Sequence, residues 1–110
     1  MQNLRYVGKN LFIEKLSINN IVKKNKTPFY LYSENQVINN YLKFTKTFKK
    51  TNPLVCFAAK SNSNVAILKI LRKLGAGADV VSGGELLKAL KAGIKASKIV
   101  FSGVGKTEDE

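Results

Sequence analysis

The stretch that decides the fold is PLVCFAAKSNSN, residues 53–64. Its first part, 53–59, is apolar and uncharged, which predicts a strand buried on both faces. Its last part, 61–64, consists of small polar residues and predicts a loop. Lys60 therefore stands where the strand ends. The chain has 17 lysines, so the position of Lys60, rather than its residue type, makes its amine a candidate for chemistry. A lysine whose stem simply lies along the strand end is the structural alternative.

The same pattern of strand, polar turn and helix is repeated after this stretch. A residue at 63–64 is expected to cap a helix with an apolar stripe, formed by Val65, Ile67, Leu68, Leu71 and Leu74. Gly75 stands where a left-handed C-cap is expected. A further strand at 78–81 leads into a helix through the capping box SGGE at 82–85. The last predicted strand covers 98–102.

Similar signals precede the stretch. Residues 28–32, PFYLY, are rich in aromatic side chains and predict a strand. The capping box SENQ at 33–36 begins a helix that must end before Pro53, because the residue before a proline avoids helical geometry. Residues 4–16 are compatible with one or two strands. Residues 17–26 are compatible with a short helix capped at its first residue.

The order of these elements predicts a parallel α/β architecture. Strands and helices alternate with short connections, which is typical of a doubly wound sheet or a (β/α) barrel. A capping box at 107–110 announces one more helix. Because a (β/α) barrel needs ~250 residues, we expect the 110 residues to be an N-terminal fragment, or a truncated gene product, of a larger enzyme.

Charge and composition argue against several classes of function. The formal net charge is +12, but the lysines are scattered in blocks no longer than two, so we expect no nucleic-acid role. No apolar stretch approaches the roughly 20 residues that span a bilayer, so we expect no membrane role. Cys56 has no disulfide partner and histidine is absent, so we expect a reducing, cytoplasmic setting and no metal site. A basic interaction module without catalysis is the alternative that the charge leaves open.

Two of the seven acidic residues lie near predicted strand ends in the middle of the chain. Asp79 lies inside an apolar strand, where an unpaired carboxylate is costly, and Glu85 follows the next turn. Because chemistry in parallel α/β folds gathers at the carboxyl ends of the strands, Lys60, Asp79 and Glu85 are the candidate site residues. Partial desolvation would favour the neutral amine of Lys60, which attacks aldehydes, and the two carboxylates would hold and orient it. The capping box alone also accounts for Glu85.

Four segments carry a resemblance to a known family. Residues 57–64, FAAKSNSN, resemble the cofactor-lysine motif of the fold-type III decarboxylases that depend on pyridoxal 5'-phosphate (PLP). Within that group, 77–86 (GADVVSGGEL) and 98–107 (KIVFSGVGKT) are similar to the diaminopimelate decarboxylase family, as is 27–33 (TPFYLYS). The combination of the lysine, the aspartate and the SGGE turn is more specific than a single short motif.

The resemblance implies a fold, a cofactor and a reaction. The fold would be an alanine racemase-like (β/α)8 TIM-type barrel in 27–110 and beyond, joined to a β-domain to which 1–26 contributes strands. Lys60 would be the Schiff-base lysine for PLP, with Asp79 and Glu85 near the cofactor. The enzyme would be a homodimer that converts meso-2,6-diaminopimelate to L-lysine and carbon dioxide.

The resemblance also leaves alternatives. The family's ring-stacking histidine, its glycine-rich phosphate loop and the acidic partner of the pyridine nitrogen would all lie beyond residue 110. Since most substrate-selecting residues would lie there too, decarboxylation of ornithine, arginine or carboxynorspermidine on the same fold stays open. An alanine racemase is disfavoured, because SNSN at 61–64 lacks the Tyr-Gly pair usual after that family's lysine.

Overall fold

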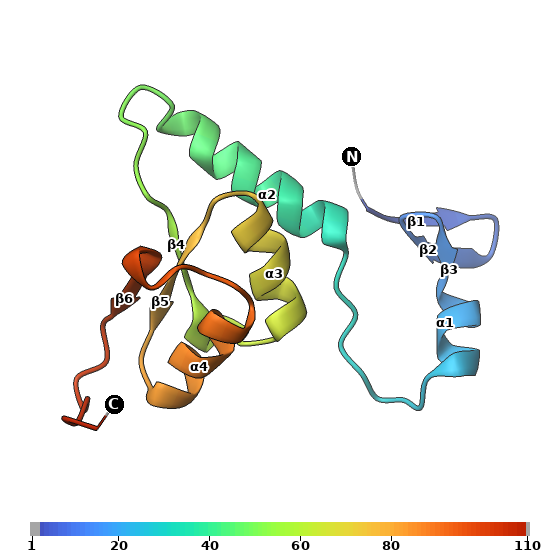
Figure 1. The fold of residues 1–110 in the computed structure, drawn as a ribbon. Coiled ribbons are helices and arrows are strands. Elements are labelled where there is room, and N and C mark those ends of the chain that lie inside the picture. The colour runs from blue at the N-terminus through green and yellow to red at the C-terminus, as the bar shows by residue number, and fades with distance from the viewer. Residues whose placement is uncertain (1–2, 110) are drawn as a thin grey trace.

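The computed structural model describes residues 3–109 and begins with a small antiparallel sheet (Figure 1). Strands β1 (Leu4–Val7), β2 (Asn10–Ile13) and β3 (Leu16–Ser17) are joined in the order β1-β2-β3. Gly8, with a φ of 60°, makes the first turn, a conformation that glycine adopts without steric cost. Helix α1 (Ile18–Lys24) follows directly. Ser17 is its N-cap residue, but its side chain makes no capping hydrogen bond.

The strand predicted at 28–32 is wrong. The segment belongs to neither sheet of the described chain, and the Tyr30 side chain is 91% exposed. Strand preference in aromatic residues reflects packing against neighbouring strands. No neighbouring strand pairs with this segment within residues 3–109, so the preference is not realised.

Helix α2 (Glu34–Thr47) begins where the capping box predicts. The Ser33 hydroxyl accepts a hydrogen bond from the Gln36 N–H at 3.0 Å. The Gln36 amide donates to Asn40 at 2.7 Å instead of reaching back to the cap, so only half of the box forms. Val37 and Tyr41 pack against α3. Leu42 and Phe44 on the outer side of α2, and Phe48 at its C-cap, stay exposed.

The parallel α/β prediction is confirmed in the second half of the chain. Strands β4 (Cys56–Ala58), β5 (Gly77–Val80) and β6 (Ile99–Phe101) form a parallel sheet in the order β4-β5-β6. Helices α3 (Val65–Lys73) and α4 (Gly83–Lys91) lie in the two connections. Right-handed crossovers between successive parallel strands place both helices on the same face of a sheet, as Figure 1 shows.

That helix-covered face holds the core. Leu68 of α3 and Ala89 of α4 are fully buried against Ala78 and Val80 of the middle strand. Side chains alternate between the faces of a strand, so Asp79 belongs to the opposite face. Val100, which is in register with Asp79, is 50% exposed there. The core is therefore one-sided within the described chain.

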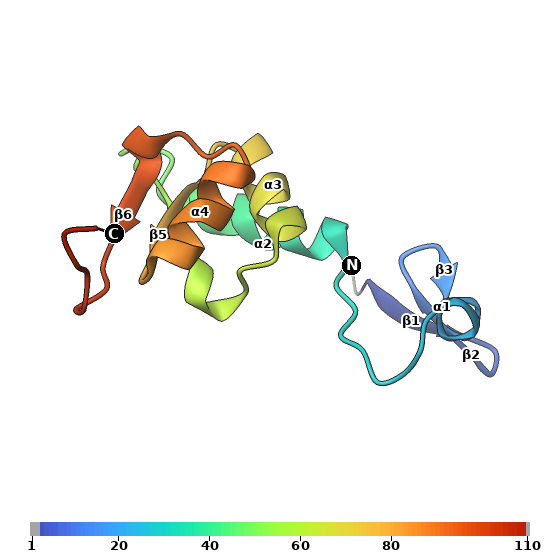
Figure 2. The ribbon, with the colours of Figure 1, turned by 60° about the horizontal axis from the view of Figure 1, so that its bottom comes forward.

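The molecule is elongated. Its Cα radius of gyration is 16.8 Å, against about 13 Å for a compact domain of this length. Figures 1 and 2 show the reason: β1–β3 and α1 lie apart from the parallel sheet and are joined to it by the extended segment before α2. The assignment of 1–26 to a β-domain stays a prediction.

The helix predicted to begin at Thr107 does not form within the described residues. After β6 the chain contains only turns, bends and irregular backbone as far as residue 109. The last residue of that capping box, Glu110, lies outside the described residues.

Candidate active site

Lys60 lies just beyond the carboxyl end of β4, two residues after Ala58. It is the central residue of η1 (Ala59–Ser61), a single 3₁₀ turn. The Ser61 hydroxyl donates to the Ala58 carbonyl at 2.8 Å, and the Asn62 N–H donates to the Ala59 carbonyl at 3.1 Å. These bonds fix the backbone that carries Lys60. Its side chain is exposed, so the desolvation expected at the strand mouth is not present in this structure.

The polar loop after Lys60 is built from side-chain caps. Asn64 caps α3 by accepting a hydrogen bond from the Ala66 N–H at 2.9 Å, and the Asn62 side chain accepts from the Asn64 N–H at 3.1 Å. Lys88 of α4 donates to the Ser63 hydroxyl at 2.9 Å. The loop is therefore tied to both neighbouring helices, which holds the end of β4 in place.

Asp79 lies on the open face of the middle strand, in register with Ala58 and Val100. Its carboxylate accepts a hydrogen bond from the Ser102 hydroxyl at 2.5 Å. Sequence reasoning expected a lysine partner instead. Within residues 3–109, no hydrogen bond or ion pair joins Lys60 to Asp79. That expectation is corrected: the donor is a serine from the neighbouring strand end.

Ser102 is the residue that sequence reasoning missed. It directly follows β6, and Lys60 likewise lies just beyond β4, two residues after the last residue of that strand. A polar residue after an apolar strand was the signal that singled out Lys60, and the same signal marks Ser102. Lys60, Asp79 and Ser102 thus come from three adjacent parallel strands, at their carboxyl ends, where ligands bind in folds of this kind.

Glu85 has a structural role in the turn between β5 and α4. Its N–H donates to the Ser82 hydroxyl at 3.3 Å, which confirms the cap. Its carboxylate accepts from the Val81 N–H at 2.9 Å. An acidic group in the first turn also favours the helix dipole. The carboxylate makes no bond to Lys60 within residues 3–109, so the expected direct contact is absent.

Cys56 shares the open face with Asp79. Its thiol lies 3.8 Å from the Lys98 carbonyl. Burial, and then the negative charge of Asp79, raises the pKa of the Cys56 thiol. The partly buried thiol of Cys56 therefore stays protonated at neutral pH.

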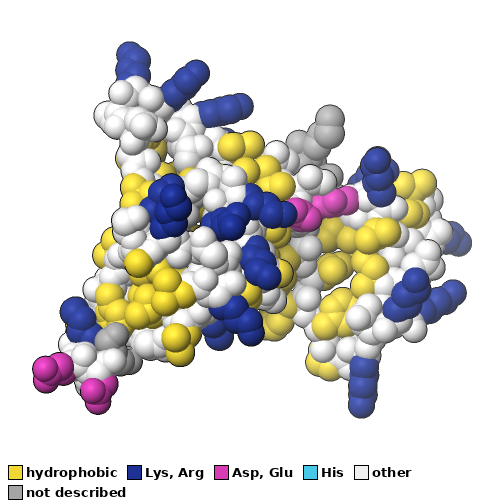
Figure 3. All heavy atoms as spheres, viewed as in Figure 1, with side chains coloured by type: hydrophobic (Ala, Val, Ile, Leu, Met, Phe, Trp, Pro, Cys, Tyr) yellow, Lys and Arg dark blue, Asp and Glu magenta, His cyan; other side chains and the backbone are white. Residues whose placement is uncertain are grey.

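The surface charge is spread rather than focused. Figure 3 shows Lys and Arg side chains projecting from every part of the visible face, with acidic side chains in only a few places. This face has no continuous basic stripe of the kind that tracks a nucleic-acid backbone. No helix in the described part of the chain is long and apolar enough to cross a bilayer.

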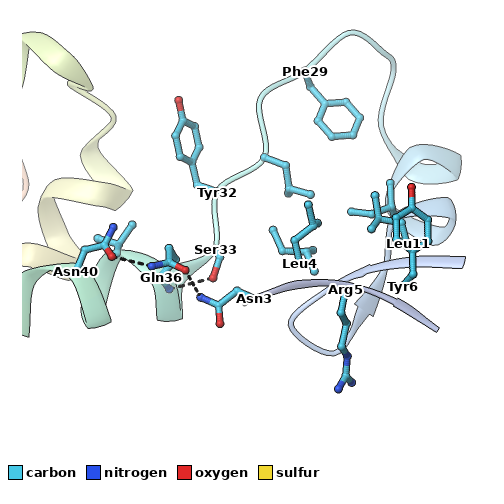
Figure 4. Close-up of a pocket in the computed structure, with 14 residues that line it drawn as sticks. Asn3, Leu4, Arg5, Tyr6, Leu11, Phe29, Tyr32, Ser33, Gln36 and Asn40 are labelled. Carbon is cyan, nitrogen blue, oxygen red and sulfur yellow. Dashed lines mark hydrogen bonds between the residues drawn. The ribbon is translucent and has the colours of Figure 1, made fainter. Parts of the chain in front are cut away.

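A hollow of about 960 Å³ lies away from these residues, between the N-terminal sheet and the start of α2. Figure 4 shows Leu4 directed toward the chain above the sheet, while Arg5 points away from it. The lining is mainly apolar, and Lys60, Asp79 and Glu85 are not part of it. The hollow therefore has an apolar surface and none of the three candidate site residues.

Comparison of the sequence with known proteins finds decarboxylases. The family described as "Pyridoxal-dependent decarboxylase, pyridoxal binding domain" matches residues 34–110. A diaminopimelate decarboxylase from Pseudomonas fluorescens is 46% identical over 110 residues, which is 100% of this chain and 26% of the relative. One from Aquifex aeolicus is 46% identical over 107 residues, 97% of this chain and 25% of the relative.

Solved structures of similar proteins have the same fold as this chain. A crystal structure of a protein from Aquifex aeolicus has a TM-score of 0.92 at 45% identity, covering 98% of this chain and 27% of that one. Diaminopimelate decarboxylase from M. jannaschii, in co-complex with L-lysine, has a TM-score of 0.91 at 37% identity, covering 98% and 26%. The chain thus spans about a quarter of the length of these relatives. It belongs to the pyridoxal-dependent decarboxylases, and residues 34–110 match their pyridoxal-binding domain.

Proposed function

We propose that this chain is the N-terminal part of a PLP-dependent enzyme that decarboxylates meso-2,6-diaminopimelate to L-lysine and carbon dioxide. The observation that carries the proposal is the position of Lys60 at the carboxyl end of a parallel strand, within a match to the pyridoxal-binding domain. The family description names no substrate. The names of the similar relatives favour diaminopimelate over ornithine, arginine or carboxynorspermidine.

The residues of this chain fit the aldehyde end of PLP. Lys60 presents an exposed primary amine on a backbone turn that two hydrogen bonds hold. Within residues 3–109 this amine makes no hydrogen bond or ion pair, so no contact with those residues must be broken before the amine, once it has lost its proton, attacks a carbonyl carbon. When bound, PLP supplies the electron sink for the electrons left by the departing carboxylate.

The two carboxylates have different proposed roles. Asp79 lies on the open face of the strand next to β4 and is proposed to face the cofactor and the lysine that holds it. Glu85 is proposed to act near the cofactor through the backbone, by holding the turn at Val81 and Ser82. Neither role needs an ion pair with Lys60.

The complete enzyme is proposed to be a homodimer with a (β/α)8 barrel. Strands β4, β5 and β6 would be part of that barrel, and the open face with Asp79 would be its interior. The segment 1–26 would contribute strands to a second, β-rich domain. The parallel order β4-β5-β6, with both helices on one face, is what the outer wall of such a barrel requires.

The proposal is tested on the complete enzyme that carries this chain. PLP bound to the protein is reduced with borohydride, and the modified residue is identified by peptide mass spectrometry. The label is expected on Lys60 and is lost in Lys60→Ala, whereas Lys69→Ala, which removes an exposed lysine on α3, keeps it. Carbon dioxide release is then compared among diaminopimelate, ornithine and arginine. A label on another lysine contradicts the site, and preferred release from ornithine or arginine contradicts the substrate.

A further inference from the structure

We infer that Ser102 is a positioning residue, which orients the Asp79 carboxylate toward the cofactor side of the sheet. This inference rests on the proposed function. Its physical basis is a hydrogen bond of 2.5 Å from the Ser102 hydroxyl to one carboxylate oxygen of Asp79. Bonds from hydroxyl groups to ionised carboxylates are short and about twice as strong as neutral ones.

Ser102 itself is held firmly. Its N–H donates to the Val80 carbonyl at 3.0 Å, which extends the pairing of β6 with β5 by one residue. Gly103, the next residue, is buried and lies so close to β5 that an added Cβ would meet the Val81 carbonyl oxygen at 2.5 Å. The hydroxyl therefore starts from a backbone that is fixed on both sides of the residue.

The residues in register with Asp79 do not orient its carboxylate. The side chains of Ala58 and Val100, its neighbours in register, are apolar and have no hydrogen-bond donor. The side chain that donates to the Asp79 carboxylate is that of Ser102. Lys106, in the loop after Ser102, donates to the Gly103 carbonyl at 3.0 Å and lies 5.5 Å from the centre of the Phe101 ring. Its amine is thus engaged away from Asp79.

The two carboxylate oxygens of Asp79 therefore have different roles. One oxygen is occupied by Ser102, and the other remains available to the lysine and cofactor at the strand ends. Without the hydroxyl, the carboxylate rotates freely about its terminal torsion, which has a broad energy profile. The Asp79 carboxylate would then point toward the cofactor side of the sheet only part of the time.

The test uses the complete enzyme and three serine variants. Ser102→Ala is expected to lower kcat about tenfold, as for loss of a hydrogen bond to a charged group, with a smaller change in KM. Ser102→Thr keeps the hydroxyl and is expected to restore most of the activity. Ser97→Ala is the matched control, because Ser97 is an exposed serine of the turn η2 (Ala96–Lys98), and it is expected to match the wild type.

A double-mutant cycle separates positioning from general stabilisation. If Ser102 acts through Asp79, Ser102→Ala costs less than about twofold in a background that already carries Asp79→Ala, because that background has no carboxylate left to position. The readout that does not depend on turnover is the absorbance band of the enzyme-bound cofactor, expected to shift in Ser102→Ala and to return in Ser102→Thr. Melting temperatures of all variants are recorded alongside.

The outcomes are distinct. Additive losses in the cycle, or an unchanged band and kcat in Ser102→Ala, overturn the inference while leaving Lys60 as the cofactor site. Equal loss in the Ala and Thr variants, with equally lowered melting temperatures, shows a packing role and also overturns it. If borohydride reduction attaches no PLP to Lys60 in the wild type, the proposed function fails, and this inference fails with it.

Discussion

The Glu14 carboxylate accepts a hydrogen bond of 2.5 Å from the hydroxyl of Ser33, the residue that caps α2. The same carboxylate accepts from the N–H of Asn35 at 3.0 Å and from its side chain at 2.8 Å. Glu14 lies in the turn between β2 and β3, so these bonds attach the N-terminal sheet to the first turn of the helix. A carboxylate at a helix N-terminus is also favoured by the helix dipole.

The Glu14 contact predicts a dependence of stability on pH. The bond from Ser33, followed by that from the Asn35 N–H, lowers the pKa of Glu14 below its usual 4.5. A lowered pKa in the folded state means that the stabilisation is present above the unfolded pKa and is lost as pH falls through the folded one. Glu14→Gln in the complete enzyme is therefore expected to lower its melting temperature at pH 7. The difference in melting temperature from the wild type is expected to shrink below about pH 4.5.

Glu14→Gln removes the negative charge without changing the backbone. Glu14 has a positive φ of 52°, and glutamine at the same position keeps that backbone cost unchanged. Glu34→Gln is the matched control, because Glu34 is an exposed carboxylate in the same first turn. A difference between Glu14→Gln and the wild type that stays constant down to pH 3, or one matched by Glu34→Gln, contradicts the specific role of Glu14.

Asp79→Asn in the complete enzyme is expected to cost activity far more than stability. The amide oxygen still accepts the Ser102 hydrogen bond, but the negative charge is gone. We expect kcat to fall by at least about tenfold, with a melting temperature within roughly 2–4 °C of the wild type. The measurements are steady-state kinetics and thermal unfolding of the same preparation. An unchanged kcat would return Asp79 to a purely structural role.

Gly103→Ala is expected to destabilise the protein by roughly 1–3 kcal/mol, because overpacking forces the backbone to move. The added Cβ would lie 2.5 Å from the Val81 carbonyl oxygen and 2.8 Å from the Phe101 ring. Gly105→Ala is the control, since nothing lies within 4 Å of a Cβ at that position. Denaturant unfolding of the complete enzyme measures both. Equal stability of the two variants would show that the loop after β6 adjusts freely.

The 110-residue chain alone is expected to be catalytically silent and to unfold without a sharp transition. Within the described residues, β4 and β6 each pair on one side only, and unpaired edges invite association with other chains. The open sheet face also lacks an opposing layer, and Val100 there is 50% exposed. Thermal unfolding and carbon dioxide release from diaminopimelate, with PLP added, test this. A sharp transition together with turnover would mean that the chain is a complete small enzyme.

The elements of the parallel sheet could be predicted because their signals are local. The caps at Ser33, Asn64 and Ser82 lie within three residues of the N–H groups they satisfy. Gly75 and Gly93 adopt the positive φ that ends a helix. Alternation of such units leaves few topologies to consider. The place of Lys60 after a strand followed from the same local patterns.

The tertiary structure alone decided which side chains meet. Asp79 and Ser102 are 23 residues apart, and Glu14 and Ser33 are 19 apart, so neither pair has a spacing that a local pattern can reveal. Strand register determines the first pair, and the docking of the N-terminal sheet determines the second. The segment 28–32 shows the converse: its residues favour a strand, but a strand exists only where another backbone supplies hydrogen bonds, and within residues 3–109 none does.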